Sequence, residues 1–368
     1  MLFKCKINYS IKHENTKSVA KLMNKKIIHT RKEDHIRINN EEDVQSGVAN
    51  GLDAFYFSHQ ALPELDLAEI DTSVQVFLKR QQVPLFISSM VGGTEQSFEL
   101  NSRLARAAQH FGMGMGIGSQ RITLQHPETN PFFDVRKFAP DVNLFANLGA
   151  VQLNNSVSPD DCKRLVEEIG ADALILHLNP LQEALQSEGN TNFSGLLKKI
   201  EQVCELLPYP VIVKEVGWGI SGETARQLQR AGVAAIDVSG AGGTSWSEVE
   251  KYRLPSEEQR EIAAAFRNWG ISTAQSLMEV KQNTHRLQVF ASGGLRSGVD
   301  VAKCIALGAD CCGFAGLFFR AAMQSEQKLI ETIDQVITGL RISMFAAGAG
   351  DIQELKKKRL QRRSYGPF

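Results

Sequence analysis

The sequence predicts an α/β protein whose main body is a (β/α)8 TIM barrel, preceded by an N-terminal arm and followed by a C-terminal helical and basic tail. Eight short apolar runs alternate with amphipathic segments between residues 83 and 345. Such near-continuous apolar runs are typical of parallel strands that helices cover. In addition, two consecutive strand ends late in the chain are rich in glycine, which is typical of the phosphate-binding end of this barrel.

Composition excludes several other classes of protein. Lysine plus arginine equals aspartate plus glutamate at 41 each in 368 residues, so no bulk charge favours nucleic acid or an anionic membrane as a partner. No apolar run reaches the roughly 20 residues that span a bilayer, and the start of the chain lacks the pattern of a signal peptide. The six cysteines have neither zinc-site nor CxxC spacing. We therefore expect buried free thiols and a cytoplasmic location.

The part before the barrel divides into two segments. Residues 1–23 are a lysine-rich extension with a short strand expected at 3–9, and residues 24–82 are an arm and barrel-capping segment. Charge in the arm is too dense for a core element. This segment is therefore either a solvated surface or an arm that brings Arg31, Lys32 and His35 over an anionic ligand. Aromatic residues around His59 are expected to pack at the barrel bottom or in a lid.

Strands and helices alternate in the barrel itself. Ser158 followed by a proline predicts a helix start, and glycine predicts helix ends at positions 112, 170, 232 and 308. The expected strands are 83–90, 113–118, 142–149, 173–178, 211–216, 234–239, 288–292 and 311–315. The expected helices between them are 99–111, 159–169, 196–207, 223–231 and 299–307.

The later connections are less regular. The link from residue 247 to residue 287 is longer than one crossover helix needs, and we expect a charged stretch at 248–260 followed by a helix near 262–269. A long helix at 321–344 is expected to close the barrel. Residues 346–368 form the basic tail.

The glycine-rich turns after the last two strands point to a phosphate. Glycines at 293 and 294 precede a helix that opens near Ser297, and a second strand end at 311–316 again finishes in glycine. Glycines let backbone N–H groups converge on an anion, and a helix N-terminus adds partial positive charge. Either turn alone is equally consistent with an ordinary strand-to-helix connection. Together they favour a phosphorylated cofactor or substrate.

Polar residues at the other strand ends suit flavin mononucleotide. Lys214 can lie against the N1/O2 edge of the flavin ring and stabilise its reduced, negative form. Asn147 and Ser119 can hydrogen-bond the polar edge of the ring, and the small residues of 89–93 leave space for it. The alternative for Lys214 is a structural ion pair with Glu215 or Asp237.

A second anion site is expected at the same end of the barrel. It would be formed by Arg31, Lys32, His35 and Arg121, with Glu183 nearby. Mg²⁺ usually takes one or two carboxylates together with phosphate oxygens and water. Glu183 is therefore a candidate for a Mg²⁺ ion that bridges to a diphosphate.

These segments together resemble the FMN-dependent (type 2) isopentenyl-diphosphate delta-isomerases. The Arg-Lys-x-x-His arm at 31–35 and the His-Leu-Asn-Pro-Leu-Gln-Glu element at 177–183 are specific to that family among FMN barrels. Less specific matches lie at 89–93, 118–121, 147–150, 214–215, 240–244 and 292–296.

The resemblance implies a role for each matching position. Gln182 and His177 would be catalytic, and Glu183 would bind Mg²⁺. The residues expected to bind substrate are Arg31, Lys32, His35, Ser119, Gln120, Arg121, Asn179 and Gln182. The residues expected to bind FMN are Ser89, Met90, Val91, Ser119, Asn147, Lys214, Thr244, Gly294, Leu295, Arg296, Ala315 and Gly316.

The implied reaction interconverts isopentenyl and dimethylallyl diphosphate without net redox change. It requires reduced FMN, with NADPH as reductant and Mg²⁺ for the diphosphate; the flavin N5 would exchange the proton and Gln182 would relay it. The resemblance also implies a tetramer or octamer. Two positions depart from the family pattern: Val91 stands where threonine is usual, and Asn190 where aspartate is usual.

Three alternatives share this barrel. A 2-hydroxy-acid oxidase or dehydrogenase needs a histidine base and an arginine beside the ends of strands six and seven, yet the sixth strand ends in Ser-Gly-Ala-Gly-Gly-Thr. A nucleotide dehydrogenase needs a cysteine nucleophile after strand six, and none follows there. A non-catalytic FMN-binding barrel would leave the element at 177–183 without a task.

Overall fold

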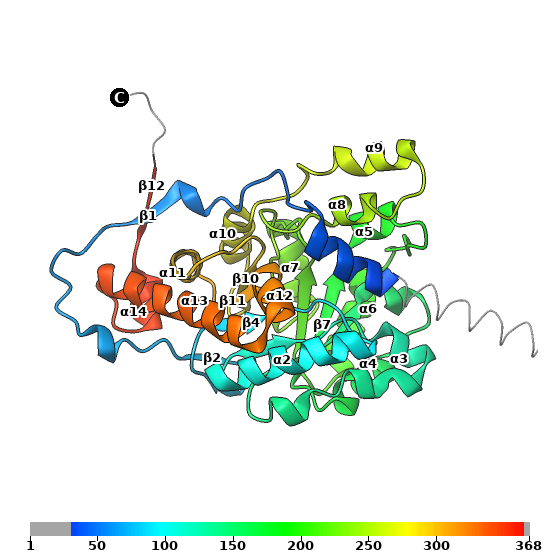
Figure 1. Cartoon of the computed structure of the whole chain (residues 1–368), viewed down its shortest axis with the longest axis horizontal. Coiled ribbons are helices and arrows are strands. Elements are labelled where there is room, and N and C mark those ends of the chain that lie inside the picture. The colour runs from blue at the N-terminus through cyan, green and yellow to red at the C-terminus, as the bar shows by residue number, and fades with distance from the viewer. Residues whose placement is uncertain (1–30, 364–368) are drawn as a thin grey trace, which may run out of the picture.

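The structure is a computed structural model and describes residues 31–363. The expected extension at 1–23 with its strand at 3–9, the first residues of the arm, Cys5 and the end of the basic tail lie outside the described residues. Figure 1 shows a central barrel ringed by helices.

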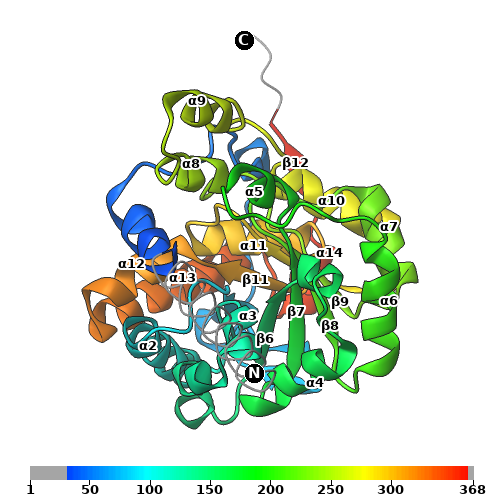
Figure 2. The same cartoon turned by 90° about the vertical axis from the view of Figure 1, so that its right-hand side faces the viewer.

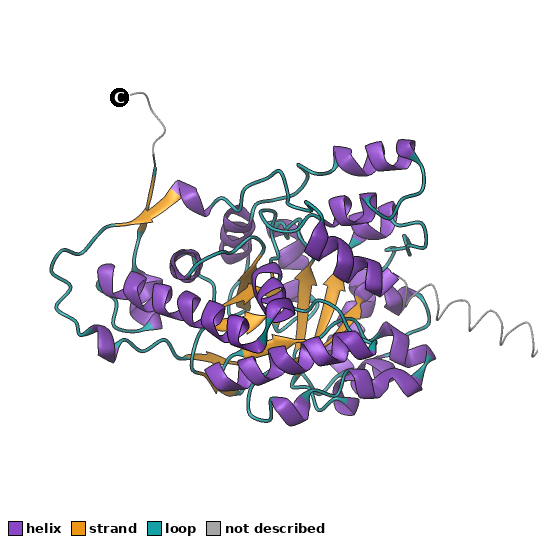
Figure 3. Cartoon of the chain, in the orientation of Figure 1, coloured by secondary structure: helices purple, strands orange, loops and turns teal. Residues whose placement is uncertain are grey.

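Eight parallel strands form a closed barrel, as predicted. β4 pairs with both β5 and β11, so the last strand returns to the first, and the closing register places Cys312 opposite Leu85. Figure 3 shows the strands at the centre of the molecule with helices outside them. The strands are β4 (Leu85–Ile87), β5 (Gly114–Gly116), β6 (Leu144–Gly149), β7 (Ala173–Leu178), β8 (Val211–Glu215), β9 (Ala235–Asp237), β10 (Gln288–Ser292) and β11 (Cys311–Phe314).

Aromatic packing fills one end of the barrel. Phe86, Phe145 and Phe290 contact one another inside it, with ring centroids 5.5 to 6.4 Å apart. Phe77 closes the group from the tip of a hairpin formed by β2 (Val74–Val76) and β3 (Lys79–Gln81), and its ring lies 6.1 Å from that of Phe290. The hairpin bonds to Gln288 at the start of β10 and to Asn143 just before β6, so this apolar plug fills the N-terminal end of the barrel.

The helices outside the barrel follow the predicted order. α2 begins earlier than expected because Thr94 and Ser97 form a capping box before it. The outer helices are α2 (Glu95–Phe111), α4 (Pro159–Glu168), α6 (Leu196–Leu206), α7 (Gly222–Arg230), α10 (Thr273–Asn283), α11 (Gly298–Ala306), α12 (Gly316–Gln324) and α13 (Glu326–Ala346). Short helices are α3 (Arg121–Gln125), α5 (Pro180–Leu185), η3 (Pro127–Phe132), η4 (Arg136–Phe138) and η5 (Ala150–Asn154).

The link before β10 corrects the prediction of one helix near 262–269. It holds α8 (Trp246–Lys251), α9 (Glu257–Ala265) and the crossover helix α10. Ser256 caps α9 by accepting from Gln259 N, and Ser272 caps α10. The two serines set helix starts that the charged composition of this stretch concealed.

The predicted helix at 321–344 is two helices. Ser325 has an extended backbone, with φ −169°, and its side chain accepts from Lys328 N. It therefore ends α12 and caps α13, so the predicted helical segment is present and is interrupted at this one residue.

The arm is more deeply packed than its charge suggested. Residues 31–41 are helical, Ile36 and Ile38 are buried, and Ile38 packs with Val44 and Val249 of α8. Figure 2 shows this dark blue helix near α8 at the upper left of the view. Reading the arm as unsuited to any core contact was wrong, because two isoleucines among the charges give the helix an apolar face.

The remaining elements flank the barrel. η1 (Leu52–Ala54) leads into β1 (Phe55–Phe57), which pairs antiparallel with β12 (Leu360–Arg362), so part of the basic tail is a strand. η2 (Leu67–Glu69) and α14 (Ile352–Lys357) lie before β2 and β12. Within residues 31–363, no helix combines the length and apolar character needed to cross a membrane.

Candidate active site

A cavity of about 490 Å³ opens at the C-terminal ends of the barrel strands. It brings together side chains from nearly every strand end and from the arm helix of residues 31–41. The predicted residues that line it are Arg31, Lys32, His35, Ser89, Met90, Val91, Ser119, Arg121, Asn147, His177, Asn179, Gln182, Glu183, Lys214, Thr244, Gly294, Leu295, Arg296, Ala315 and Gly316.

Gln120 is the predicted site residue that does not line the cavity. Its side chain is fully buried, its Nε2 donates to Leu165 O at 3.0 Å, and its Oε1 accepts from Asn147 N at 3.1 Å. Gln120 therefore braces β6 from behind.

One end of the cavity is a glycine cradle. Gly293 and Gly294 have φ of 106° and 70°, and a Cβ on Gly294 would lie 2.1 Å from the carbonyl oxygen of Gly242. Two glycine loops thus pack backbone to backbone, which no other residue type allows. The helix α11 begins at Gly298, shortly after this loop, and α12 begins at Gly316, which also lines the cavity, so their N-termini suit a phosphate.

Lys214 lies beside this cradle and is already paired. Its Nζ is 3.0 Å from Asp237 Oδ2 and donates to the carbonyl of Glu215 at 2.9 Å. The carboxylate of Glu215 instead accepts from the backbone N–H groups of residues 216–218. The structural ion pair considered for Lys214 is thus present, with Asp237. The same ammonium group also lines the cavity, so the two interpretations are compatible.

His177 is held against Asn147 across neighbouring strands. Its Nδ1 is 2.8 Å from Asn147 Oδ1. Burial, with the nearby charges of Lys214 and Arg31, lowers the pKa of His177 to about 4. The imidazole is therefore neutral at neutral pH and donates Nδ1–H to Asn147. That bond leaves the amide N–H₂ of Asn147 available to a ligand, and His177 carries no positive charge for a diphosphate.

The opposite end of the cavity holds a cluster of cations. Lys32 Nζ donates to Gly92 O and lies 5.3 Å from the centre of the Phe133 ring. Burial and then the charge of Arg31 lower the pKa of Lys32 to about 7. Burial and Arg31 also lower the pKa of Arg121, whose Nε has no hydrogen-bond partner among the described residues. Cations crowded in this way favour a multiply charged anion.

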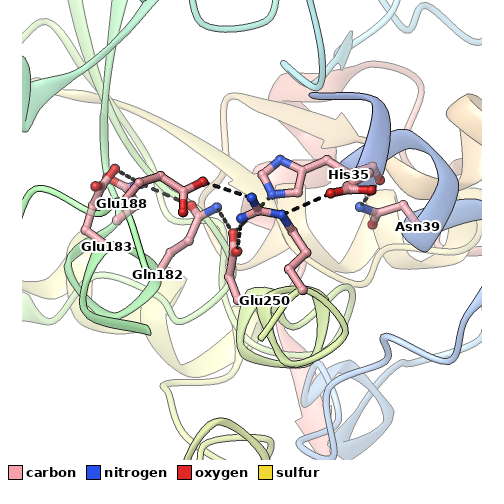
Figure 4. A network of polar contacts seen from close by, with 9 residues as sticks. His35, Asn39, Gln182, Glu183, Glu188 and Glu250 are labelled. Atoms are coloured by element: carbon pink, nitrogen blue, oxygen red, sulfur yellow. Dashed lines mark hydrogen bonds and ion pairs between the residues drawn. The ribbon is translucent and has the colours of Figure 1, made fainter. Parts of the chain in front are cut away.

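The predicted Gln182–Glu183 element is fixed by a polar network, shown in Figure 4. Asn179 Nδ2 lies 3.0 Å from both Gln182 Oε1 and Glu183 Oε1, and Gln182 Nε2 donates to Glu250 Oε1 at 3.0 Å. Asn190 N donates to Glu183 Oε2 at 2.5 Å. Because Asn179 donates to its oxygen and Glu250 accepts from its nitrogen, the Gln182 amide has one defined orientation.

Glu250 is a site residue that the sequence did not reveal. It is fully buried on α8, and its Oε1 is 3.1 Å from Nε2 of His35. Burial alone would raise its pKa, but bonds from His35 and Gln182 and the charges of His35 and Arg253 hold the pKa at about 2. Glu250 is therefore ionised, and His35 must be the donor.

Trp246 was also missed. It lines the cavity, and its ring stands edge-on to that of His35, with centroids 5.0 Å apart. Its position just after Thr244, at the end of a predicted barrel strand, was a signal that could have identified it. Glu250 had no such signal, because it lies inside a stretch interpreted as a charged link.

The donor set fits one Mg²⁺ ion shared with a substrate. Among residues 31–363, no group of three histidine, cysteine, aspartate or glutamate side chains could hold a metal. Glu183 lines the cavity, and the buried Oδ1 of neighbouring Asn179 has no hydrogen-bond partner. One carboxylate and one amide oxygen suit a Mg²⁺ that takes its other ligands from phosphate and water.

The residues also fit FMN. The buried hydroxyls of Ser88 and Ser89 have no hydrogen-bond partner in the described part of the chain, although both line the cavity. Val91 meets Gly118 backbone to backbone, since a Cβ on Gly118 would lie 2.3 Å from the Val91 carbonyl carbon. The valine that replaces the usual threonine thus keeps the backbone contact and loses only a hydroxyl.

Comparison with known proteins shows what this chain is similar to. A family model described as FMN-dependent dehydrogenase matches residues 150–362. An isopentenyl-diphosphate delta-isomerase from a Nostoc species is 49% identical over 328 residues, which cover 89% of this chain and 94% of that protein. A protein of the same name from a Synechococcus species is 51% identical over 328 residues, with the same coverage.

Solved structures share the fold at lower identity. A mandelate oxidase with an FMN monooxide adduct superposes with a TM-score of 0.60 at 19% identity, covering 89% of this chain and 95% of that chain. A lactate oxidase from Pediococcus acidilactici gives a TM-score of 0.62 at 16% identity, covering 90% and 87%. At such identity the likeness establishes the barrel alone.

Proposed function

The chain belongs to the family of FMN-dependent isopentenyl-diphosphate delta-isomerases, and on that premise we propose how its residues interconvert isopentenyl and dimethylallyl diphosphate in isoprenoid biosynthesis. One observation supports the proposal most strongly. The cavity has two separate regions whose chemistry suits an anion, namely the glycine cradle at Gly293 and Gly294 and the cation cluster of Arg31, Lys32 and Arg121. A phosphorylated cofactor and a diphosphate substrate require two such sites.

We assign the cradle and its neighbours to FMN. Backbone N–H groups around Gly294 and Gly316 would hold the phosphate, and Lys214 and the Asn147 amide would contact the ring. Bound in its reduced form, FMN supplies an electron-rich ring that can give a proton to a substrate carbon and take one back. The pairing of Lys214 with Asp237 keeps the ammonium group in place at the cavity wall.

We assign the cation cluster to the diphosphate. Arg31, Lys32 and Arg121 would neutralise its charge, and Glu183 would hold a Mg²⁺ ion that offsets further phosphate charge. Binding energy from this charged end orients the small apolar tail of the substrate. The side chain of Trp246, which also lines the cavity, offers an aromatic face to a carbon that gains positive character.

Gln182 is the proposed relay for the second proton. Its amide oxygen accepts from Asn179, and its Nε2 donates to the ionised Glu250. A proton taken up on Gln182 Oε1 can be matched by release of an Nε2 proton to the Glu250 carboxylate. The reverse transfer restores the amide and the Glu250 carboxylate and frees the same proton from Gln182 Oε1. That proton would return to the reduced flavin, which gave the first one, so that protons balance and neither residue is consumed.

Further proposals concern the setting of the reaction. NADPH is the proposed reductant of FMN, and a homo-oligomer in the cytoplasm is the proposed state of the protein. Free thiols at all five described cysteines support a reducing compartment.

The 2-hydroxy-acid alternative lacks a suitable base. Among the described residues, the histidines that line the cavity are His35, bonded to Glu250, and His177, bonded to Asn147. Ser239 and Thr244 lie at the end of β9, where such an enzyme needs its histidine. A non-catalytic barrel would give no reason for the fixed amide of Gln182.

An anaerobic assay tests the function. The purified protein is supplied with FMN, Mg²⁺, NADPH and isopentenyl diphosphate, and the dimethylallyl isomer is measured beside NADPH consumption. We expect isomer that depends on reduced flavin, with NADPH consumed only to prime the enzyme. A flavin-loaded protein that oxidises lactate or mandelate and forms no isomer would contradict the proposal.

A further inference from the structure

We propose that Arg253 is a positioning residue for this site, which aligns Glu250 on the Gln182 amide and joins three segments over the substrate end of the cavity. The inference rests on the proposed function, because Gln182 matters only if the site moves a proton. It concerns a residue that lies outside the cavity wall and matches no motif of the sequence.

Arg253 contacts three carboxylates from three parts of the chain. Its Nη1 is 2.7 Å from Glu250 Oε2, which lies on α8. Its Nη2 is 2.8 Å from Glu188 Oε1, in the loop after α5, and its Nε forms a longer ion pair of 3.6 Å with Asp34 of the arm helix. The guanidinium therefore links α8, the loop after α5 and the arm.

The contact with Arg253 gives the two oxygens of the Glu250 carboxylate different partners. Oε2 accepts from Arg253, while Oε1 accepts from both Gln182 and His35. Since Arg253 fixes one oxygen, the other must face the amide and the imidazole. The charged and polar groups facing Glu250 are thus Arg253 from its own segment, Gln182 from α5 and His35 from the arm helix.

Burial makes this contact important. The Glu250 side chain is fully buried and that of Arg253 is 14% exposed. A buried carboxylate that loses one partner is left with an uncompensated charge. It would then turn, take up water or draw closer to His35, and each of these changes moves it away from Gln182.

An arginine is needed because of its geometry. The planar guanidinium directs several donors along fixed directions and reaches three carboxylates at once, whereas an ammonium group is a point charge on a flexible stem. Lysine at this position can keep a charge near Glu250, but it cannot hold all three segments. Substitution by lysine should therefore restore part of the function.

The experiment compares Arg253→Met and Arg253→Lys with a control from the same link. Arg260, on α9, donates to the carbonyl of Leu254 and pairs with Glu257 of its own helix, so Arg260→Met is the matched control. We expect Arg253→Met to lower kcat by about 10- to 100-fold, as loss of an outer partner does in other sites, with a smaller change in KM and an unchanged Kd for FMN. Arg253→Lys should lie between wild type and Arg253→Met.

A double-mutant cycle separates positioning from general support. In a protein that already carries Glu250→Gln, adding Arg253→Met should lower kcat by no more than about threefold, since the effects of coupled residues are non-additive. An equal fold-loss on both backgrounds would show that Arg253 does not act through Glu250. Wild-type kcat in Arg253→Met, or in Arg253→Lys if the methionine variant does not fold, would also overturn the proposal.

Hydrogen exchange tests the same idea without turnover. Peptides from α5 and α8 should exchange faster in Arg253→Met or Arg253→Lys than in wild type and Arg260→Met, with the barrel strands unchanged. If wild-type protein forms no isomer, the proposed function fails, and this measurement still decides whether Arg253 fixes these segments. Unchanged exchange in both Arg253 variants would refute that role.

Discussion

Protonation of Lys32 should control how the apparent affinity for the diphosphate changes with pH. The ammonium group lies between the Gly92 carbonyl and the Phe133 ring, beside Arg31, and no carboxylate is paired with it in the described part of the chain. Burial and the neighbouring guanidinium lower its pKa from 10.5 to about 7. Lys32 is therefore charged below pH 7 and becomes neutral above it, so substrate binding should weaken as pH rises.

The size of the effect follows from the population of the charged form. If the diphosphate binds only when Lys32 is protonated, KM equals its low-pH value multiplied by the factor 1 + 10^(pH − pKa), with a pKa of about 7. That factor is about 1.1 at pH 6 and about 11 at pH 8, so KM should rise roughly tenfold between them. The Kd for FMN should change little, because the cradle lies at the other end of the cavity.

The assay is isomer formation at saturating FMN and Mg²⁺ between pH 6 and pH 8.5, with Lys32→Arg and Lys32→Met beside the wild type. The diphosphate itself titrates in this range, and Lys32→Arg reports that contribution because its charge does not change. We expect a weaker pH dependence in Lys32→Arg, and a high KM in Lys32→Met with the same weak dependence. A wild-type profile that matches Lys32→Arg would show that Lys32 does not titrate in this range.

Three further outcomes are expected. Glu183→Gln should lower kcat by about 100-fold or more while FMN stays bound, whereas Lys214→Ala should raise the Kd for FMN. Bound flavin is measured by absorbance after gel filtration. Equal flavin loss in both variants would contradict this assignment of Glu183 to the metal and Lys214 to the flavin. Gly294→Ala should weaken the binding of FMN strongly, since its Cβ would meet the Gly242 carbonyl at 2.1 Å. It should weaken the binding of riboflavin, which has no phosphate, much less. Fluorescence titration compares the two affinities, and equal losses would argue against the cradle as the phosphate site. The pKa of Glu250 is held at about 2, so above its unfolded pKa of about 4.3 this carboxylate should stabilise the fold by about 3 kcal/mol, and that contribution should be lost as pH falls towards 2. In urea unfolding, the free energy of unfolding should fall less steeply with decreasing pH in Glu250→Gln than in wild type. An equally steep fall would refute the assignment.

The barrel could be predicted from the sequence because its signals are local. Each strand is an apolar run, and each helix start or end carries a residue with a defined backbone preference, such as Ser158 or Gly112. The prediction for the link before β10 failed because its signals are not local. Glu248 and Glu250 are buried there because Lys251 and Arg253 pair with them, and a run of charges alone cannot show which of its members neutralise one another.

The same distinction explains the site. Residues on strand ends were placed correctly in the cavity because parallel strands bring their carboxyl ends together, whatever the distance along the chain. Gln120 lies in the turn before α3 and not in an extended strand, and its side chain points away from the cavity to Leu165 of the outer helix α4. The alternation of side chains along a strand therefore could not place it. Glu250 and Arg253 reach the site from a helical excursion whose position depends on the arm and the loop after α5.

Charge balance gives the two ends of the cavity different behaviour. At the flavin end the Lys214 ammonium group is paired with the buried carboxylate of Asp237, and burial raises the pKa of neighbouring Glu215 to about 7. At the substrate end Lys32 and Arg121 have lowered pKa values, and arriving phosphate charge would reverse that effect. Proton uptake by Lys32 should therefore accompany binding of the diphosphate. The cation cluster thus links substrate binding to pH through Lys32.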